Sequence, residues 1–189
     1  MDQSTRLLGC LAKIAIAGAV ATGGTGGTVS RTFIPLNDAA TADAKPIWLD
    51  IGVIESISEQ TSSSPIETFR PSPGVLVADD VLETKLKREL TATITECSNA
   101  MWLLAQRALK ATTLQTGAIG QYVPLSGGIS KMWLKLQRYD GQDNSLLFAE
   151  QIWGKAVISD AIDVGGEKPI QFKLKFTQLW SPLNSATGN

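Results

Sequence analysis

The side chains that most often do chemistry in proteins are scarce in this sequence, and their spacing does not bring them together. There is no histidine among the 189 residues, which removes the commonest general base and the usual zinc ligand. The adjacent pair Asp79-Asp80 is the nearest approach to two catalytic carboxylates. Neighbouring residues of a strand point to opposite faces, so these carboxylates do not converge on one site. We therefore predict no catalytic residues and no enzyme activity.

Motifs for metal ions and phosphate groups are equally weak. Cys10 and Cys97 cannot form a usual four-ligand zinc site without histidine, and their spacing leaves open whether they form a disulfide or stay as two free thiols. The segment 140–144 contains Asp140, Asp143 and Asn144 but lacks the closing glutamate of a calcium loop, and a hairpin turn explains it better. The glycines of 23–27 precede neither a helix nor a Lys-Ser/Thr pair. We predict no metal and no cofactor.

Charge is unevenly distributed along the chain. Residues 1–31 carry a net charge of +2, residues 32–84 a net charge of −7 and residues 85–189 a net charge of +4, which leaves −1 overall. The acidic middle and the basic remainder would suit copies of the chain facing each other head to tail. Folding can also interleave these segments and mix their charges, which is the simpler interpretation. A sequence pI of about 5.5 argues against a nucleic-acid surface on Lys131, Lys135 and Arg138.

The apolar segment 7–21 has two interpretations. Ile14, Ile16 and Val20 alternate with small residues, which predicts a strand. The same segment also resembles a short secretory signal that ends at Ala19-Val20-Ala21, although Lys13 interrupts its apolar run. We favour the strand. The glycine-rich turn at 23–27 then closes an N-terminal strand and arm, residues 1–28.

The middle of the chain is predicted to form three strands, a long loop and a helix. We expect strands at 29–36, 46–57 and 84–96, and a loop at 58–80, which contains a serine run and three prolines. In the last of these strands Leu86, Leu90, Ala92 and Ile94 share a dry face, with Arg88 as the one charged exception. Apolar residues spaced three and four apart after Ser98 predict one helix, residues 98–111 with Ser98 as its cap.

The C-terminal third predicts strands. We expect them at 131–139, 145–153, 155–162 and 170–179, the first two joined by a hairpin turn at Asp140-Gly141, and a short extended arm at 181–189. The fold class that follows is a single mainly β domain, residues 1–189, with antiparallel sandwich- or barrel-forming sheets and one flanking helix. Long strands with polar rows would also suit a barrel that several subunits build together.

The order of these elements resembles the tail tube (major tail) proteins of long-tailed bacteriophages. The similarity rests on Asp50-Ile51-Gly52, the loop 58–80, the charged strand 82–94 and the helix after Glu96-Cys97-Ser98. It extends through the C-terminal stretches MWLKLQRYDG, EQIWGKAVI and FKLKFTQLWSP and covers residues 46–182. The similarity lies in the order of the elements and in their general residue patterns, without a short diagnostic motif.

The resemblance implies a virion structural protein. Six copies would form a ring whose sheets join into a ring-shaped β-barrel, and rings would stack into a hollow conduit for DNA ejection. The loop 58–80 and the terminal arms would contact neighbouring subunits. Implied partners are further copies, a tape-measure protein in the lumen, tail-tip and tail-terminator proteins, and double-stranded DNA in transit, with no membrane. The implied location is the virion tail, assembled in the host cytoplasm. The implied inter-subunit residues are Glu59, Ser62, Ser63, Ser64, Glu67, Arg70, Asp79, Asp80, Leu183 and Asn184.

Two alternatives remain open from the sequence. The tail could be non-contractile, as we expect, or contractile. The chain could instead be a secreted β-sandwich binding module of the adhesin or carbohydrate-binding type. In that case residues 1–21 would be a cleaved signal, and Trp133 or Trp153 would serve as a ligand platform.

Overall fold

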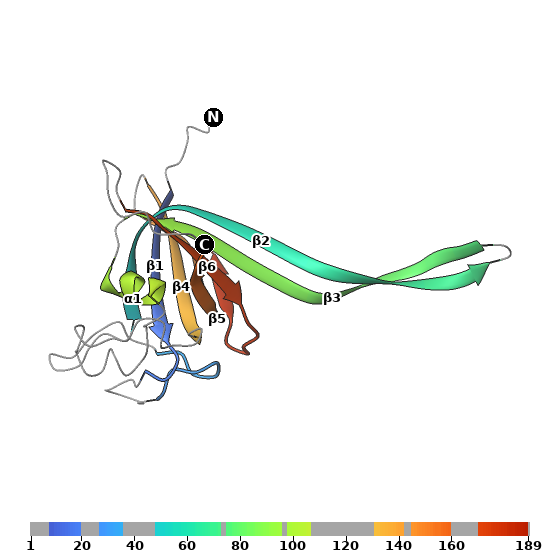
Figure 1. Cartoon of the computed structure of the whole chain (residues 1–189), viewed down its shortest axis with the longest axis horizontal. Helices are drawn as coiled ribbons and strands as arrows, with labels where there is room; N and C mark the ends of the chain where they lie inside the picture. The colour runs from blue at the N-terminus through green and yellow to red at the C-terminus, as the bar shows by residue number, and fades with distance from the viewer. Residues whose placement is uncertain are drawn as a thin grey trace.

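A computed structural model describes residues 8–19, 27–35, 48–72, 75–95, 98–106, 131–141, 145–159 and 170–188. These residues form one antiparallel sheet of seven strands and one short helix (Figure 1). The elements are β1 (Leu8–Ile16), β2 (Trp48–Ser72), β3 (Val75–Ile94), α1 (Asn99–Ala105), β4 (Lys131–Asp140), β5 (Leu146–Ile158), β6 (Phe172–Gln178) and β7 (Ser185–Gly188). The predicted class, mainly β with one helix, is confirmed.

The sheet closes on itself within one chain. Its strand order is β4-β1-β2-β3-β6-β5-β7, and β4 also pairs with β5, so that six strands form a closed ring of pairings. Within the ring, closure gives the backbone groups of each strand partners on both edges, whereas β2 and β3 continue beyond it as a hairpin. That sheets of several copies join into a larger barrel stays a prediction.

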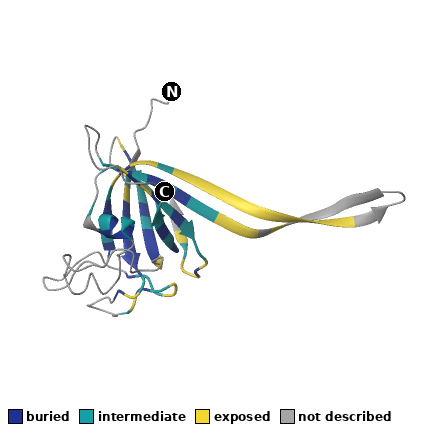
Figure 2. Cartoon of the chain, viewed as in Figure 1, coloured by how far each residue is buried: buried dark blue, intermediate teal, exposed yellow. Residues whose placement is uncertain are grey.

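The interior of the closed sheet holds the main apolar core. Ala12, Ile14 and Ile16 of β1 lie opposite Leu136, Leu134 and Met132 of β4, and all are buried. Because side chains of a strand alternate between faces, this register points one apolar row from each strand inward. The buried residues gather in this body, whereas the residues of the projecting part of β2 and β3 whose burial is described are exposed (Figure 2). The predicted strand within 7–21 is thus confirmed as β1, which pairs with β2 on one edge and β4 on the other.

The helix α1 packs against this core. Met101 and Leu104 are buried in it, and the ring of Trp102 contacts that of Phe172 edge-on, with centroids 5.0 Å apart. Ser98 takes the extended backbone conformation of an N-cap, but its side chain makes no capping hydrogen bond. The helix ends at Ala105, earlier than predicted, and residues 107–111 lie outside the described part of the chain.

A second apolar cluster lies on the outer face of the sheet. Trp48, Ala15, Trp133 and Trp153 form one cross-strand row over β2, β1, β4 and β5. Residues 27–35 cover this row: the Trp133 indole donates a hydrogen bond to the Ser30 carbonyl (2.8 Å), and the Trp48 indole donates one to the Pro35 carbonyl (3.0 Å).

Two predictions about this region are therefore wrong. The segment 29–36 is not a strand, because among its described residues only Ser30 and Phe33 pair, in an isolated bridge. Trp133 and Trp153 are not ligand platforms, because their exposed fractions are 0% and 5%. Residues 27–35 cover the tryptophan row as an irregular segment and do not form a further strand.

The strands predicted at 145–153 and 155–162 are one strand, β5, which continues through Gly154 to Ile158. β6 packs so close to Gly154 that no side chain fits there, since a Cβ would lie 2.4 Å from the Phe176 ring and 2.4 Å from the Thr177 carbonyl oxygen. Glycine here allows close approach of two strands and does not mark a turn.

The C-terminal segment predicted as an extended arm folds back onto the body. β7 pairs with β5 through Ser185–Gly188, alongside the part of β5 that extends past β6. Asn184 fixes the turn between β6 and β7: its side-chain oxygen accepts from the Trp153 backbone N–H (2.8 Å), and its side-chain nitrogen donates to the Leu179 carbonyl (3.1 Å). The predicted strand 170–179 is confirmed as β6, with Phe172, Leu174 and Phe176 buried.

We predict that Gly154→Ala destabilises the fold by about 1–3 kcal/mol, because the added methyl group meets a backbone oxygen that cannot move without breaking the β5–β6 pairing. Urea denaturation followed by circular dichroism measures this loss. Gly141→Ala, at the exposed turn after β4, is the matched control and should stay close to wild type. Equal stability of the two variants would contradict the close approach.

Candidate assembly interface

The β2–β3 hairpin extends far beyond the strands that flank it. β1 pairs with β2 only as far as Val53, and β6 pairs with β3 only from Glu89 to Ile94. The hairpin itself continues to the pair Ser72–Val75. We call its free part, residues 62–72 and 75–87, the arm; it projects from the body as a two-stranded ribbon (Figure 1).

The loop predicted at 58–80 is therefore strand, apart from residues 73–74, which the structure does not describe. A ribbon with solvent on both faces needs no alternation of apolar and polar residues, so the usual strand signal is absent there. Pro65 and Pro71 fit because each strand of the arm is an edge strand, where proline is tolerated.

The arm exposes large apolar side chains. Ile66 and Phe69 are 55% and 53% exposed, and Leu86 is 73% exposed. Single exposed apolar residues are ordinary on protein surfaces. Here three of them lie on an isolated ribbon, and such a ribbon is marginally stable in water without a covered face. The arm is thus the part of the described structure that gains most from contact with another surface.

Bulges set the course of the hairpin. In β2, Gly52 has a φ of 105° and its N–H donates to the Asp50 carboxylate (2.8 Å), where the register with β1 shifts. In the arm, Lys85 and Leu86 together oppose Ser63, and Lys85 has a φ of 57°. Bulges bend a strand and increase its twist. The Asp50-Ile51-Gly52 segment, on which the resemblance partly rests, is therefore a bulge inside β2.

Arg88 fastens the arm to the body. Its guanidinium contacts the Glu59 carboxylate on β2, donates to the Glu150 carboxylate on β5 (2.9 Å) and donates to the Gln178 side chain on β6 (3.3 Å). The Glu150 side chain is 1% exposed. This network explains the charged exception on the dry face of β3: Arg88 points inward at the end of the core and neutralises a buried carboxylate.

The charges of this network stabilise one another. The hydrogen bond from Arg88 lowers the pKa of Glu59, and the hydrogen bond to Glu59 raises the pKa of Arg88 above its ordinary value. Arg138 also lies here, with its guanidinium 5.5 Å from the centre of the Phe148 ring. Its Nε and the Glu150 Oε1 are buried without a hydrogen-bond partner among the described residues. Burial raises the pKa of the nearby Cys10, a free thiol.

On the outer face of β3, Glu89 makes a second set of ion pairs. Its carboxylate contacts Lys87 (2.8 Å) and Lys175 of β6 (3.1 Å), and the Thr177 hydroxyl donates to it (3.3 Å). The hydrogen bonds from Lys87 and then Lys175 lower the pKa of Glu89. The two faces of β3 thus each carry an ion pair next to the arm.

The inter-subunit residues implied by the resemblance lie mostly on or beside the arm. Glu59 is engaged with Arg88, whereas Ser62, Ser63, Ser64 and Glu67 are exposed on the arm. Arg70, Asp79 and Asp80 occupy strand positions of the arm. Leu183 is exposed, and Asn184 makes the intramolecular hydrogen bonds described above. Their roles between subunits stay predictions. Ile66, Phe69 and Glu150 were not foreseen, since only their exposure or burial singles them out.

No group of three or more metal-binding side chains occurs among the described residues. No helix in the same ranges is long and apolar enough to cross a membrane. Cys97 lies outside them, so its pairing is not addressed.

Comparison with known proteins gives little. No family model matches the chain, and no curated protein matches it. Among solved structures, it is similar to a chain in the cryo-EM structure of the anti-feeding prophage (AFP) baseplate, 6-fold symmetrised, with a TM-score of 0.39 and 10% identity over 100% of this chain and 98% of that one. A likeness this weak to a prophage baseplate does not assign a role to this chain.

We predict that Arg88→Met destabilises the protein by about 3–5 kcal/mol, because the buried Glu150 carboxylate loses its ion-pair partner. The double variant Arg88→Met with Glu150→Leu should regain much of this loss, since the buried charge is gone as well. Denaturant unfolding of the wild type, Arg88→Met, Glu150→Leu and the double variant measures the coupling energy between Arg88 and Glu150. Additive losses would show that Arg88 does not compensate Glu150.

We also predict a loss of stability in acid. The pKa of Glu59 and the pKa of Glu89 are both lowered in the folded protein from an ordinary value of 4.5. Such a carboxyl group stabilises the fold at pH values above its ordinary pKa, and this contribution disappears as the pH falls through the lowered pKa. The urea midpoint should therefore fall between about pH 6 and about pH 3, and fall less in Glu59→Gln with Glu89→Gln. An unchanged pH dependence in that variant would contradict the assignment.

Proposed function

We propose that the chain is a tube subunit of a phage-type tail, a structural protein whose copies stack into a hollow conduit. The observation that carries the proposal is the arm: a long two-stranded ribbon with exposed Ile66, Phe69 and Leu86, beside which no other described strand pairs beyond its base. A contact between the arm of one copy and a different surface of the next is heterologous, and such contacts generate rings or filaments.

The finer parts of the proposal follow the sequence resemblance. Six copies form a ring, rings stack head to tail, and double-stranded DNA passes through the lumen without specific binding. The tape-measure, tail-tip and tail-terminator proteins are the further partners, in a virion tail assembled in the host cytoplasm. We propose a long non-contractile tail, with a contractile tail as the alternative, and no enzymatic activity.

The rival function, a secreted binding module, loses its main support. Its ligand platforms, Trp133 and Trp153, are buried beneath residues 27–35. Removal of residues 1–21 would also delete β1, which lies between β2 and β4 and contributes Ile14 and Ile16 to the core. Such a cleavage would open the closed sheet.

We predict that replacing residues 62–87 by an Asn-Gly turn yields a folded protein that does not assemble. The turn would join Thr61 to Arg88, which are register partners, and would leave the Arg88 contacts with Glu59 and Glu150 in place. Negative-stain microscopy and sedimentation of concentrated protein should show rings or tubes of uniform diameter for the wild type and monomers for the variant.

A second variant tests the same contact with the arm kept. Ile66→Ser with Phe69→Ser removes apolar surface and should weaken assembly without unfolding the body, since both residues are exposed. Tubes from the arm-less protein, or a wild type that stays monomeric at every concentration and salt tested, would overturn the proposed function.

A further inference from the structure

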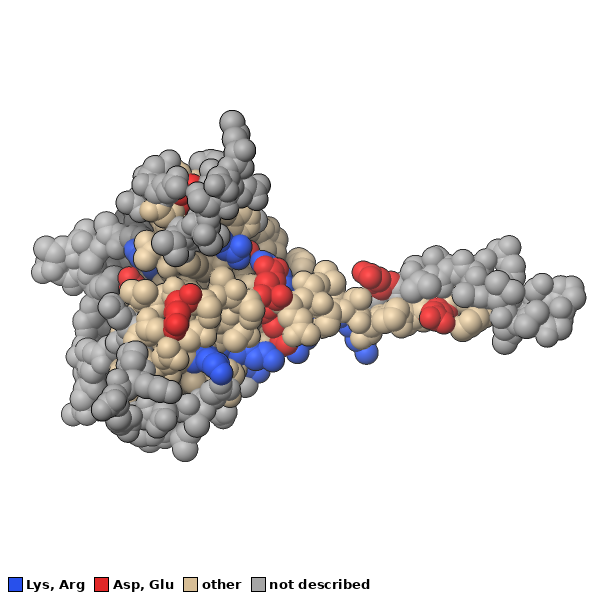
Figure 3. Space-filling model, turned by 90° about the horizontal axis from the view of Figure 1, so that it is seen from above, with Lys and Arg blue, Asp and Glu red and all other residues tan. Residues whose placement is uncertain are grey.

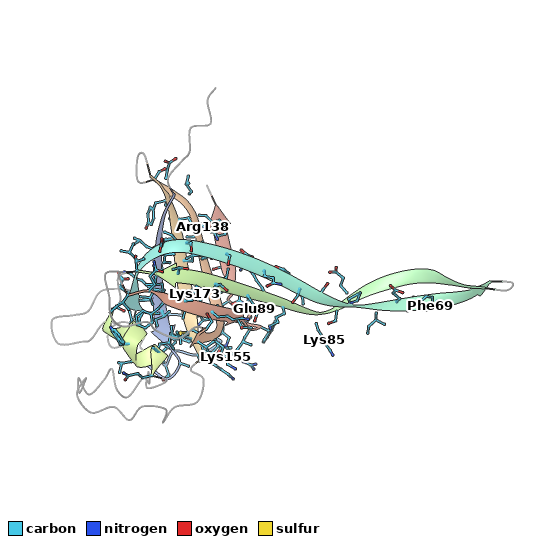
Figure 4. The ribbon with its side chains drawn as sticks, turned by 45° about the horizontal axis from the view of Figure 1, so that its top comes forward. Phe69, Lys85, Glu89, Arg138, Lys155 and Lys173 are labelled. Carbon is cyan, nitrogen blue, oxygen red and sulfur yellow. The ribbon has the colours of Figure 1, made fainter. Side chains whose placement is uncertain are left out.

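The outer face of the body carries a group of lysines, two of which, Lys131 and Lys155, make no ion pair with the described residues. Lys131 of β4 lies directly opposite Lys155 of β5, and Lys175 of β6 is a diagonal neighbour of Lys155 on the same face. Lys173 follows on the same side of β6 and is exposed. We call Lys131, Lys155, Lys173 and Lys175 the lysine face; Figure 4 labels Lys155 and Lys173 on the body.

A like-charged pair directly across two strands is unfavourable, so its surroundings matter. A second pair, Lys13 and Lys135, shows how the chain compensates one: Lys13 also lies opposite Asp50, and the Lys135 ammonium is 5.8 Å from the centre of the Trp48 ring. Lys131 and Lys155 make no ion pair within the described part of the chain. The Glu89 carboxylate is already engaged with Lys87 and Lys175.

The arm is acidic toward its tip and carries Lys85 and Lys87 at its base, so its net charge is −1. Its distal part, residues 64–72 and 75–84, contains Glu67, Asp79, Asp80 and Glu83 against Arg70, a net charge of −3. Pro65 pairs with Glu83 and Glu67 pairs with Val81, so Glu67 and Glu83 are diagonal neighbours on one face of the ribbon. Both are exposed; Figure 3 shows acidic side chains toward the tip of the arm, a basic group nearer its base, and several basic groups on the body.

The arm does not lie over the Lys131–Lys155 pair of its own chain. It leaves the body at Glu59 and Arg88 and projects away from it (Figures 1 and 4). A second copy can bring the two charge groups together, because the donor surface and the acceptor surface are different regions of the same chain. The contact is then directional and repeats from copy to copy.

We propose that the acidic face of the arm, Glu67 and Glu83, docks on the lysine face of a second copy of this chain. This inference rests on the proposed function and adds to it the surface that receives the arm and the charges that set its position. The ion pairs give the contact orientation and dependence on salt, and the apolar arm residues such as Ile66 and Phe69 supply burial beside them.

Charge exchange tests this docking. Lys131→Glu with Lys155→Glu, and separately Glu67→Lys with Glu83→Lys, should each raise the critical concentration for assembly more than about tenfold, because like charges then face each other. Mixing the two variants, or combining all four substitutions in one chain, should restore assembly, since opposite charges face each other again. The four-substitution protein has the net charge of the wild type, so recovery cannot come from net charge.

Controls separate the possible outcomes. Glu55→Lys reverses an exposed charge of β2 outside both surfaces and should assemble as the wild type does. Raising the salt concentration should weaken wild-type assembly. Circular dichroism of each variant confirms that it is folded.

Four outcomes would overturn the inference. If the wild type assembles and both reversed variants assemble equally well, the lysine face does not receive the arm. The same holds if the variants fail and the exchange does not rescue them. If the lysine variant assembles normally but loses binding to a 20-base-pair DNA duplex, the face is a nucleic-acid surface instead. A wild type that never assembles overturns the proposed function and this inference together.

Discussion

The ion pair between Arg88 and Glu150 is the interaction on which the body and the arm both depend. Glu150 is a carboxylate buried at the end of the closed sheet, and a buried charge requires a partner. Arg88 supplies it from the position where β3 leaves its neighbour β6 and becomes part of the free hairpin. The same guanidinium holds Glu59 on the paired strand. The Arg88 side chain therefore both neutralises the buried Glu150 carboxylate and fixes the start of the arm.

The sheet meets three different environments along its strands. Its inner face packs around Ile14, Leu90 and Phe176, and part of its outer face carries the tryptophan row beneath residues 27–35. The arm residues whose burial is described, 62–69, 83 and 85–87, are exposed and have neither cover. A hairpin that keeps its backbone pairing but not its burial is an incomplete structure by itself, and its stability increases when another surface covers it. Assembly through the arm and stability of the arm are thus linked.

Charge follows the same division. Lysines lie on the outer face of β4, β5 and β6, carboxylates lie on the arm, and the near-zero net charge of −1 conceals this separation. Ion pairs at a solvent-exposed contact contribute modest energy but select orientation and suppress wrong partners. Apolar side chains beside them are better suited to hold the contact together. A subunit that adds to an assembly in one direction therefore benefits from ion pairs, which select its orientation, and from apolar contacts, which hold it in place.

The sequence by itself determined the elements whose burial pattern is regular. The alternation in 170–179 and 131–139 and the three-four spacing after Ser98 predicted β6, β4 and α1, because each packs one face against the core. It also marked Arg88 as out of place. Tertiary structure alone decided the rest. The arm shows no alternation where its burial is described, because residues 62–69 are exposed on both faces of β2. Gly154 interrupts no strand because Phe176 fills its place, and the tryptophans are covered by a segment distant in sequence. Closure of the ring, and the Glu150 carboxylate that meets Arg88 inside it, depend on pairings between distant segments, which a local pattern does not encode.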